Sequence, residues 1–180
     1  MSYRTLPCWV ALGVVGLACA GAQAIAADSG SADSASADSG FTTIILTADV
    51  AKPAAEVWKK IGGFCDIGNF MKMKCAYASG DGGLGTVRTL NGRIKEVMVG
   101  QTSHSYTYTQ DPVLKDMYHA TLDVESAGPG KSKIFYRIVY NPSGLLPNQT
   151  PEKYHDQHVR MFSGPLAKMK AAAEGTEGAG

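Results

Sequence analysis

The stretch from Gly80 to Gly100 constrains the fold of this chain most, because it has the pattern of a tight β-hairpin. Two runs rich in β-forming residues, Leu84–Leu90 and Arg93–Val99, flank the dipeptide Asn91-Gly92, which is a strong short-range hairpin signal. Side chains alternate between the two faces of a strand, so the register of this hairpin decides which of them point into the protein.

Two registers fit the hairpin. A two-residue type I′ turn pairs Leu90 with Arg93 and puts Arg88 and Glu96 on opposite faces. A three-residue loop, with glycine in the left-handed position, pairs Thr89 with Arg93 and puts Arg88 and Glu96 on one face. We favour the second register, because its face is mostly apolar and holds one arginine and one glutamate that can pair. Such a face suits a cavity better than a solid core, where buried charge is costly. The face then holds Thr86, Arg88, Leu90, Ile94, Glu96 and Met98.

The first 27 residues have the features of a secretory signal peptide. Arg4 supplies the positive charge, residues 9–20 are apolar, and small residues at 22–27 offer a cleavage site. We expect export to the periplasm, without lipoprotein anchoring and without stable membrane insertion. Residues 28–40 (DSGSADSASADSG) have nothing to bury, which predicts a disordered linker. The folded domain is then expected over residues 41–174, followed by a disordered tail at 175–180.

Charge and motifs exclude several function classes. Arg4 is the only charged residue before Asp28, so the cleaved chain keeps 16 basic side chains against 16 acidic ones. This balance, without a Lys/Arg cluster, argues against nucleic-acid binding. The sequence has no nucleophile elbow, P-loop, dinucleotide fingerprint or metal-ligand spacing, so we expect no cofactor and no metal. The sequence neither identifies nor excludes a protein partner.

Two cysteines, Cys65 and Cys75, remain in the expected domain. An even pair in an exported protein is consistent with a disulfide. Two buried free thiols are the alternative, because cysteine is also a common small core residue.

The remaining pattern predicts an α+β domain in which a curved antiparallel sheet of about seven strands wraps around a long C-terminal helix. The last helix is expected to begin after the capping residue Thr150, to run to about Glu174 and to be kinked at Pro165. Its inner stripe is expected to hold Tyr154, His158, Met161, Phe162, Leu166 and Met169. The other elements are expected at Phe41–Val50 (strand), from Lys52-Pro53 to Gly62 (helix), around Phe64–Phe70 (short helix), and at Lys74–Ala78, Ser103–Gln110, Tyr118–Glu125 and Lys133–Tyr140 (strands).

This order and several short motifs resemble the Bet v 1-like (START-like, SRPBCC) superfamily, in particular its bacterial polyketide cyclase/dehydrase and lipid-transport branch. The resemblance implies a helix-grip fold with a deep cavity between the curved sheet and the long helix. The motifs that carry it are PAAEVW from Pro53, GLGTVR from Gly83, IKEV from Ile94, SYTY from Ser105, YHATL from Tyr118 and GKSK from Gly130.

The resemblance also implies a set of ligand-binding residues. On the sheet side these are Arg88, Glu96, Tyr106, Tyr108, Tyr118, Ala120 and Leu122, and on the helix side Tyr154, His158 and Phe162. Met98 joins them from its place on the favoured hairpin face. If the protein is an enzyme, Glu96, His158 and Arg88 are the candidate catalytic residues for acid–base chemistry. A structural ion pair between Arg88 and Glu96 is the alternative.

Three functions follow as expectations. The first is a periplasmic protein that binds a small hydrophobic molecule, aromatic or polyketide-like, in an internal cavity. The second is a cofactor-independent enzyme of the cyclase, lyase or dehydratase type. The third, suggested by the resemblance alone, is an accessory protein of a periplasmic oxidation system.

Overall fold

The computed structural model describes residues 40–110 and 118–176. The expected signal peptide, the linker except for Gly40 and the last four residues of the tail lie outside these described residues. The elements in chain order are β1 (Thr42–Val50), α1 (Ala54–Ile61), α2 (Ile67–Met71), β2 (Cys75–Ser79), β3 (Val87–Leu90), β4 (Ile94–Gln101), β5 (Ser105–Gln110), β6 (His119–Ser126), β7 (Ser132–Tyr140), the 3₁₀ turn η1 (Pro142–Gly144) and α3 (Pro151–Glu174).

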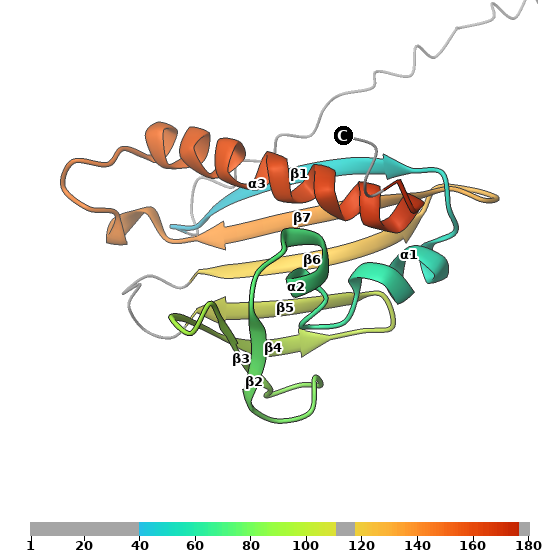
Figure 1. Cartoon of the computed structure of the whole chain (residues 1–180). Helices are drawn as coiled ribbons and strands as arrows, with labels where there is room; N and C mark the ends of the chain where they lie inside the picture. The colour runs from blue at the N-terminus through green and yellow to red at the C-terminus, as the bar shows by residue number, and fades with distance from the viewer. Residues whose placement is uncertain (1–39, 111–117, 177–180) are drawn as a thin grey trace, which may run out of the picture. The chain divides into compact units, whose positions relative to one another are not determined.

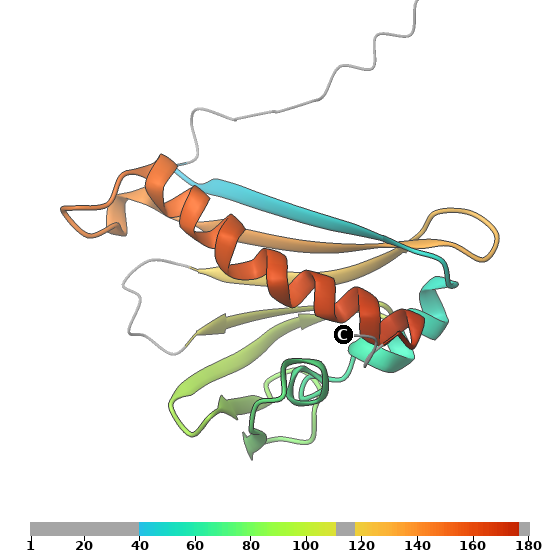
Figure 2. The ribbon, with the colours of Figure 1, turned by 45° about the horizontal axis from the view of Figure 1, so that its top comes forward.

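The strands form one antiparallel sheet in the order β1-β7-β6-β5-β4-β3-β2 (Figure 1). The sheet is curved, and α3 crosses one of its faces while α1 and α2 lie beside the end of α3 (Figure 2). The predicted α+β architecture is confirmed, with the two short helices after the first strand and the long helix at the end.

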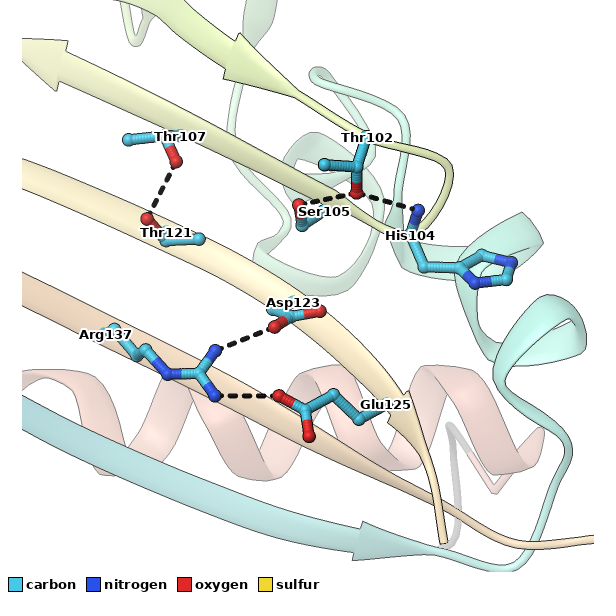
Figure 3. A network of polar contacts seen from close by, with 8 residues as sticks. All are labelled: Thr102, His104, Ser105, Thr107, Thr121, Asp123, Glu125 and Arg137. Carbon is cyan, nitrogen blue, oxygen red and sulfur yellow. Dashed lines mark hydrogen bonds and ion pairs between the residues drawn. The ribbon is translucent and has the colours of Figure 1, made fainter. Parts of the chain in front are cut away.

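Burial alternates along the strands and separates an inner face, which lies under α3, from an outer face. In β7 every second side chain is buried, from Ser132 to Tyr140. The outer face carries a polar network, in which Arg137 bridges Asp123 at 2.8 Å and Glu125 at 2.9 Å (Figure 3). This pattern is typical of an antiparallel sheet that packs on the core with one face and contacts water with the other.

Two short helices and a disulfide close one end of the inner face. In α1, Val57 and Ile61 are fully buried, and the helix ends at Gly62. In α2, Phe70 is the buried side chain. Of the two alternatives for the cysteines, the structure has the disulfide, which joins Cys65 before α2 to Cys75 at the start of β2.

Helix α3 is the central element that covers the sheet. Thr150 caps it, since its Oγ1 accepts from the backbone N–H of Lys153 at 3.3 Å. The helix continues past Pro165 without interruption and ends at Gly175, which adopts the left-handed conformation. Met161 is 50% exposed, so its expected place in the inner stripe is wrong. The stripe of α3 that the sheet covers is narrow, and the buried side chains within it are His158, Leu166, Met169 and Ala173.

Candidate functional site

The β3–β4 hairpin places Arg88 directly opposite Glu96 on the inner face. The predicted shared face is therefore what the structure shows, but the predicted pairing of Thr89 with Arg93 is wrong. Thr89 pairs with Lys95 instead, and the three-residue loop is 91–93 rather than 90–92. The observed register differs from the predicted one by two residues, which is one full period of side-chain alternation. The same side chains therefore stay on the inner face.

A contact outside the hairpin explains the position of the loop. The N–H of Asn91 donates to the carbonyl of Lys74 at 2.8 Å, and the Oδ1 of Asn91 accepts from the N–H of Lys74 at 3.0 Å. Asn91 and Gly92 both have positive φ, which these two residue types tolerate best. Asn91 is thus held in the loop by the residue before β2, a contact that no local pattern reveals.

The guanidinium of Arg88 is 1% exposed and is surrounded on every side by named partners. Its Nε and Nη2 each lie 2.6 Å from Oε2 of Glu96, and its Nη1 donates to the backbone carbonyl of Phe64. The ring of Phe64 lies 4.0 Å from the guanidinium carbon, and that of Tyr108 lies 5.0 Å from it. A buried charge is tolerable only when it is paired and hydrogen-bonded in this way.

The second carboxylate oxygen of Glu96 is the acceptor of a further contact. Nε2 of Gln110, from the neighbouring strand β5, donates to it at 3.3 Å. Glu96 is 3% exposed, so both of its oxygens are bonded inside the protein. This part of the inner face therefore contains a compact polar unit inside apolar walls.

Tyrosine hydroxyls extend this unit toward the centre of the sheet. The hydroxyls of Tyr108 and Tyr136 lie 2.5 Å apart, and either one can be the donor. Burial raises the pKa of both phenols well above the usual value, and it also raises the pKa of Tyr118 and of Tyr106. These phenols stay protonated at neutral pH and present neutral hydrogen-bond donors and acceptors.

The side of α3 that packs against the inner face is aromatic. The ring of His158 stacks on that of Tyr154 at 3.8 Å and lies 5.9 Å from that of Phe162. The ring of Phe162 in turn lies 4.9 Å from that of Tyr136. Rings at these separations make favourable contacts beyond the area that they bury.

His158 has a defined tautomer in its neutral form. Its Nδ1 lies 2.9 Å from the backbone carbonyl of Tyr154, and a carbonyl only accepts, so Nδ1 carries the proton. Nε2 is then the acceptor nitrogen. Burial lowers the pKa of His158, and the hydrogen bond to Tyr154 opposes this effect. The imidazole is therefore neutral at pH 7.

The structure brings the expected site residues onto the inner face in two groups. One group, at the β3–β4–β5 end, contains Arg88, Glu96, Met98, Tyr106 and Tyr108, and the other, under α3, contains Tyr118, Ala120, Leu122, Tyr154, His158 and Phe162. The Tyr108–Tyr136 hydroxyl contact joins the two. The three catalytic candidates are divided between the groups, since Arg88 and Glu96 contact each other while His158 packs against Tyr118, Tyr154 and Phe162.

Three residues of this polar unit were not predicted. Gln110 and Tyr136 have the alternation phase of their buried neighbours, so strand periodicity could have found both. Phe64 contributes a backbone carbonyl and a ring from the turn before α2. No sequence pattern indicates such a contribution.

A separate surface groove of about 490 Å³ lies between the edge strand β1 and α3. Its lining is mostly aliphatic, with Leu46, Val159 and Leu166 among the residues. Its one charged residue, Lys170, already contacts the carbonyl of Asp49 at 2.5 Å. Its lining contains neither the tyrosine hydroxyls nor the buried ion pair that distinguish the inner face.

Within residues 40–110 and 118–176, no helix is long and apolar enough to cross a bilayer. In the same part of the chain, no group of three or more His, Cys, Asp and Glu residues is placed to hold a metal ion.

Neither a protein-family model nor a curated protein sequence matches the chain. Solved structures do match its fold. A protein from Thermobifida fusca is 19% identical with a TM-score of 0.62, and the match covers 75% of this chain and 95% of that protein. XoxI from Bacillus cereus is 19% identical with a TM-score of 0.56, over 73% of this chain and 94% of XoxI.

Norcoclaurine synthase from Thalictrum flavum, whose structure contains dopamine and hydroxybenzaldehyde, is 20% identical with a TM-score of 0.55. That match covers 76% of this chain and 86% of the synthase. At such identities the likeness concerns the fold and not the activity. Together with the seven-stranded curved sheet and the long C-terminal helix, it shows that this chain has the Bet v 1-like helix-grip fold that its motifs predict.

Proposed function

We propose that this protein binds a small, uncharged, hydrophobic molecule with an aromatic or polyketide-like skeleton, between the inner sheet face and α3. Bet v 1-like folds typically bind small hydrophobic ligands. The observation that carries the proposal is the line of buried polar groups on an otherwise apolar face, from Arg88 and Glu96 to Tyr108 and Tyr136. Such groups are costly in a core that only has to be stable.

The chemistry of these groups supports an uncharged ligand with oxygen atoms. The raised pKa of Tyr108 and Tyr136 keeps both phenols neutral, so they can donate to a carbonyl or hydroxyl oxygen. Arg88 and Glu96 already neutralise each other, and a charged ligand would have to displace one of them. Aromatic side chains of the group under α3, such as Phe162 beside Tyr136, offer ring contacts to an aromatic skeleton.

Binding is a better-supported function than catalysis. Acid–base catalysis needs the acid and the base at the same reacting atoms. Here Glu96 and His158 belong to different groups of the inner face, and each is engaged by neighbours of its own. We propose that the protein acts in the periplasm, on the basis of the signal-peptide pattern in residues 1–27.

The test is to express the full chain, to purify it from the periplasmic fraction and to search for a co-purifying ligand by native mass spectrometry. A panel of uncharged aromatic compounds is then screened by thermal shift. We expect Tyr108→Phe to lower the affinity for a bound compound by about threefold to tenfold, which corresponds to the loss of one hydrogen bond. Tyr77→Phe is the matched control, since Tyr77 is 40% exposed on the edge strand β2. The absence of any ligand and of any thermal shift would contradict the proposal.

A further inference from the structure

The Cys65–Cys75 disulfide connects two segments that both lie close to Arg88. Cys65 directly follows Phe64, whose carbonyl accepts from Nη1 of Arg88. Cys75 pairs with Leu90 in β3, two residues beyond Arg88 and on the same face of the sheet. The bridge therefore connects the segment that contacts the guanidinium to β2, the strand that pairs with the Arg88 strand β3.

Phe64 holds Arg88 in two ways. Its carbonyl accepts a hydrogen bond from Nη1 of Arg88, and its ring covers the guanidinium carbon at 4.0 Å. The same ring contacts Tyr106 at 5.4 Å and Tyr108 at 6.3 Å, and Phe64 is 1% exposed. A displacement of Phe64 would remove an acceptor from Arg88 and loosen two tyrosines at the same time.

The hydrogen bonds inside the Phe64 turn are local, whereas apolar packing of Phe64, and of Ile61 and Phe70 on either side of it, holds the turn in the core. The N–H of Gly63 donates to the Asp66 carboxylate at 2.6 Å, and the N–H of Asp66 donates to the Gly63 carbonyl at 2.9 Å. These bonds shape the turn, and the disulfide is the covalent link between it and the sheet. Helix α2 packs directly on the bridge, since a Cβ on Gly68 would lie 3.4 Å from Cβ of Cys75.

We expect a small reductant to reach the bridge, because both cysteines are partly exposed rather than buried. A dithiol such as dithiothreitol transfers two electrons and two protons to the S–S bond. Two cysteine thiols form, and the dithiol closes to its own cyclic disulfide. No other co-reactant is needed, and an oxidant of the disulfide class reverses the step.

We propose that the Cys65–Cys75 disulfide is a redox-dependent positioning device for Arg88. In the oxidised protein the bridge fixes the Phe64 turn over the guanidinium and keeps the Arg88–Glu96 pair rigid. In the reduced protein the turn is released, the guanidinium exchanges its protons faster and the polar unit binds its ligand less well. Only the ligand-binding part of this inference rests on the proposed function.

The test compares the oxidised full chain, the chain reduced with dithiothreitol and the double variant Cys65→Ser/Cys75→Ser. Hydrogen exchange of the Arg88 Nε–H is followed by NMR, and 2-naphthol, a neutral fluorescent phenol, serves as the ligand probe. We expect exchange at Arg88 to accelerate by about tenfold or more when the bridge is absent, and the affinity for 2-naphthol to fall. The Nε chemical shift of Arg137, on the outer face, is the control and should not move.

The two readouts separate the two proposals. Equal Arg88 exchange in folded oxidised and reduced protein would overturn the positioning role. Faster exchange with no binding of 2-naphthol in either state would support the positioning role and count against the proposed function. If reduction unfolds the chain, the comparison is repeated in trimethylamine N-oxide, which favours the compact state, and the same outcomes apply.

Discussion

Arg88 and Glu96 lie directly opposite each other on β3 and β4, and two guanidinium nitrogens of Arg88 lie 2.6 Å from one carboxylate oxygen, Oε2 of Glu96. Both side chains are almost excluded from solvent. Desolvation of two charges costs several kcal/mol for each ion, and the attraction between them offsets this cost only when the geometry is good. Removal of one partner alone should therefore destabilise the protein. Replacement of both by apolar residues should change its stability little.

The first prediction concerns this asymmetry. Glu96→Ala leaves an unpaired buried guanidinium and should lower the free energy of unfolding by about 3–5 kcal/mol. The double variant Arg88→Met/Glu96→Leu should recover most of that loss while ligand binding stays impaired. Urea unfolding at neutral pH measures the loss of stability and its recovery.

The matched control for this pair is Arg137→Met on the outer face. It removes two ion pairs, to Asp123 and Glu125, from an arginine side chain that is 30% exposed, so each pair should be worth only about 0–1 kcal/mol. A double variant that is as unstable as Glu96→Ala alone would show that packing, rather than the unpaired charge, dominates.

The second prediction concerns the hydroxyls of Tyr108 and Tyr136. Tyr108→Phe removes a partner from a buried hydroxyl and should cost about 1–3 kcal/mol, whereas Tyr108→Phe/Tyr136→Phe should cost less than the sum of the single changes. Burial raises the pKa of both phenols above the unfolded value of 10.0, so the stability that they confer is present below pH 10 and is lost as the pH rises further.

Denaturant unfolding at neutral pH and at about pH 11 tests both statements, since the unfolded phenols ionise between the two values. The alkaline loss of stability should be smaller in the double variant than in the natural sequence. An alkaline loss that is equal in the two proteins would assign it to other groups.

Much of the fold was predictable because alternation and helix caps are local signals. The run Lys133–Tyr140 marked the strand that the structure has as β7, and Thr150 with Pro151 marked the start of α3. The face shared by Arg88 and Glu96 was predictable for the same reason. The loop position was not, because Lys74 holds Asn91 from outside the hairpin.

The composition of the site was less predictable than the fold. Phe64 acts through its backbone carbonyl, which every residue type possesses, so its identity carries no signal for that role. Met161 has the helical spacing of the inner stripe, but the sheet covers too narrow a part of α3 to include it. Tertiary packing, rather than local periodicity, decided both cases.

The third prediction is a pH effect on stability through His158. Burial lowers the pKa of His158 below its unfolded value of 6.5, against the opposing effect of its hydrogen bond to Tyr154. The native state then binds fewer protons than the unfolded state, so stability is full above pH 6.5 and falls as the pH drops toward the native pKa. The fall should be measurable as a difference between about pH 7.5, where stability is full, and about pH 5.5.

His158→Gln should flatten this fall, because glutamine does not titrate. His155→Gln is the matched control, since His155 is exposed on the same helix one turn earlier. Thermal unfolding at several pH values measures the slope for all three proteins. A fall that persists unchanged in His158→Gln would assign the acid sensitivity to the carboxylates instead.

The fourth prediction concerns the attachment of the last turn of α3 to the end of β1. The carboxylate of Glu174 accepts from the N–H of Ala51 at 3.1 Å and from Nζ of Lys170 at 2.6 Å, and the same Nζ lies 2.5 Å from the carbonyl of Asp49. These side chains satisfy backbone groups where the edge strand β1 ends, so they fasten the helix to the sheet across 123 residues of chain.

Glu174→Ala should speed the exchange of the Ala51 amide by about threefold to tenfold, because that N–H loses its acceptor. Hydrogen bonding, chiefly from Lys170, lowers the pKa of Glu174 below 4.5. Its contribution is therefore present above pH 4.5 and is lost as the pH falls through the native pKa. Lys168→Met, on the exposed side of the same helix, is the control and should leave Ala51 unchanged. Because the ion pair is partly exposed, the effect on global unfolding should stay within about 1 kcal/mol, and a larger loss would mean that α3 depends on this attachment for its place on the sheet.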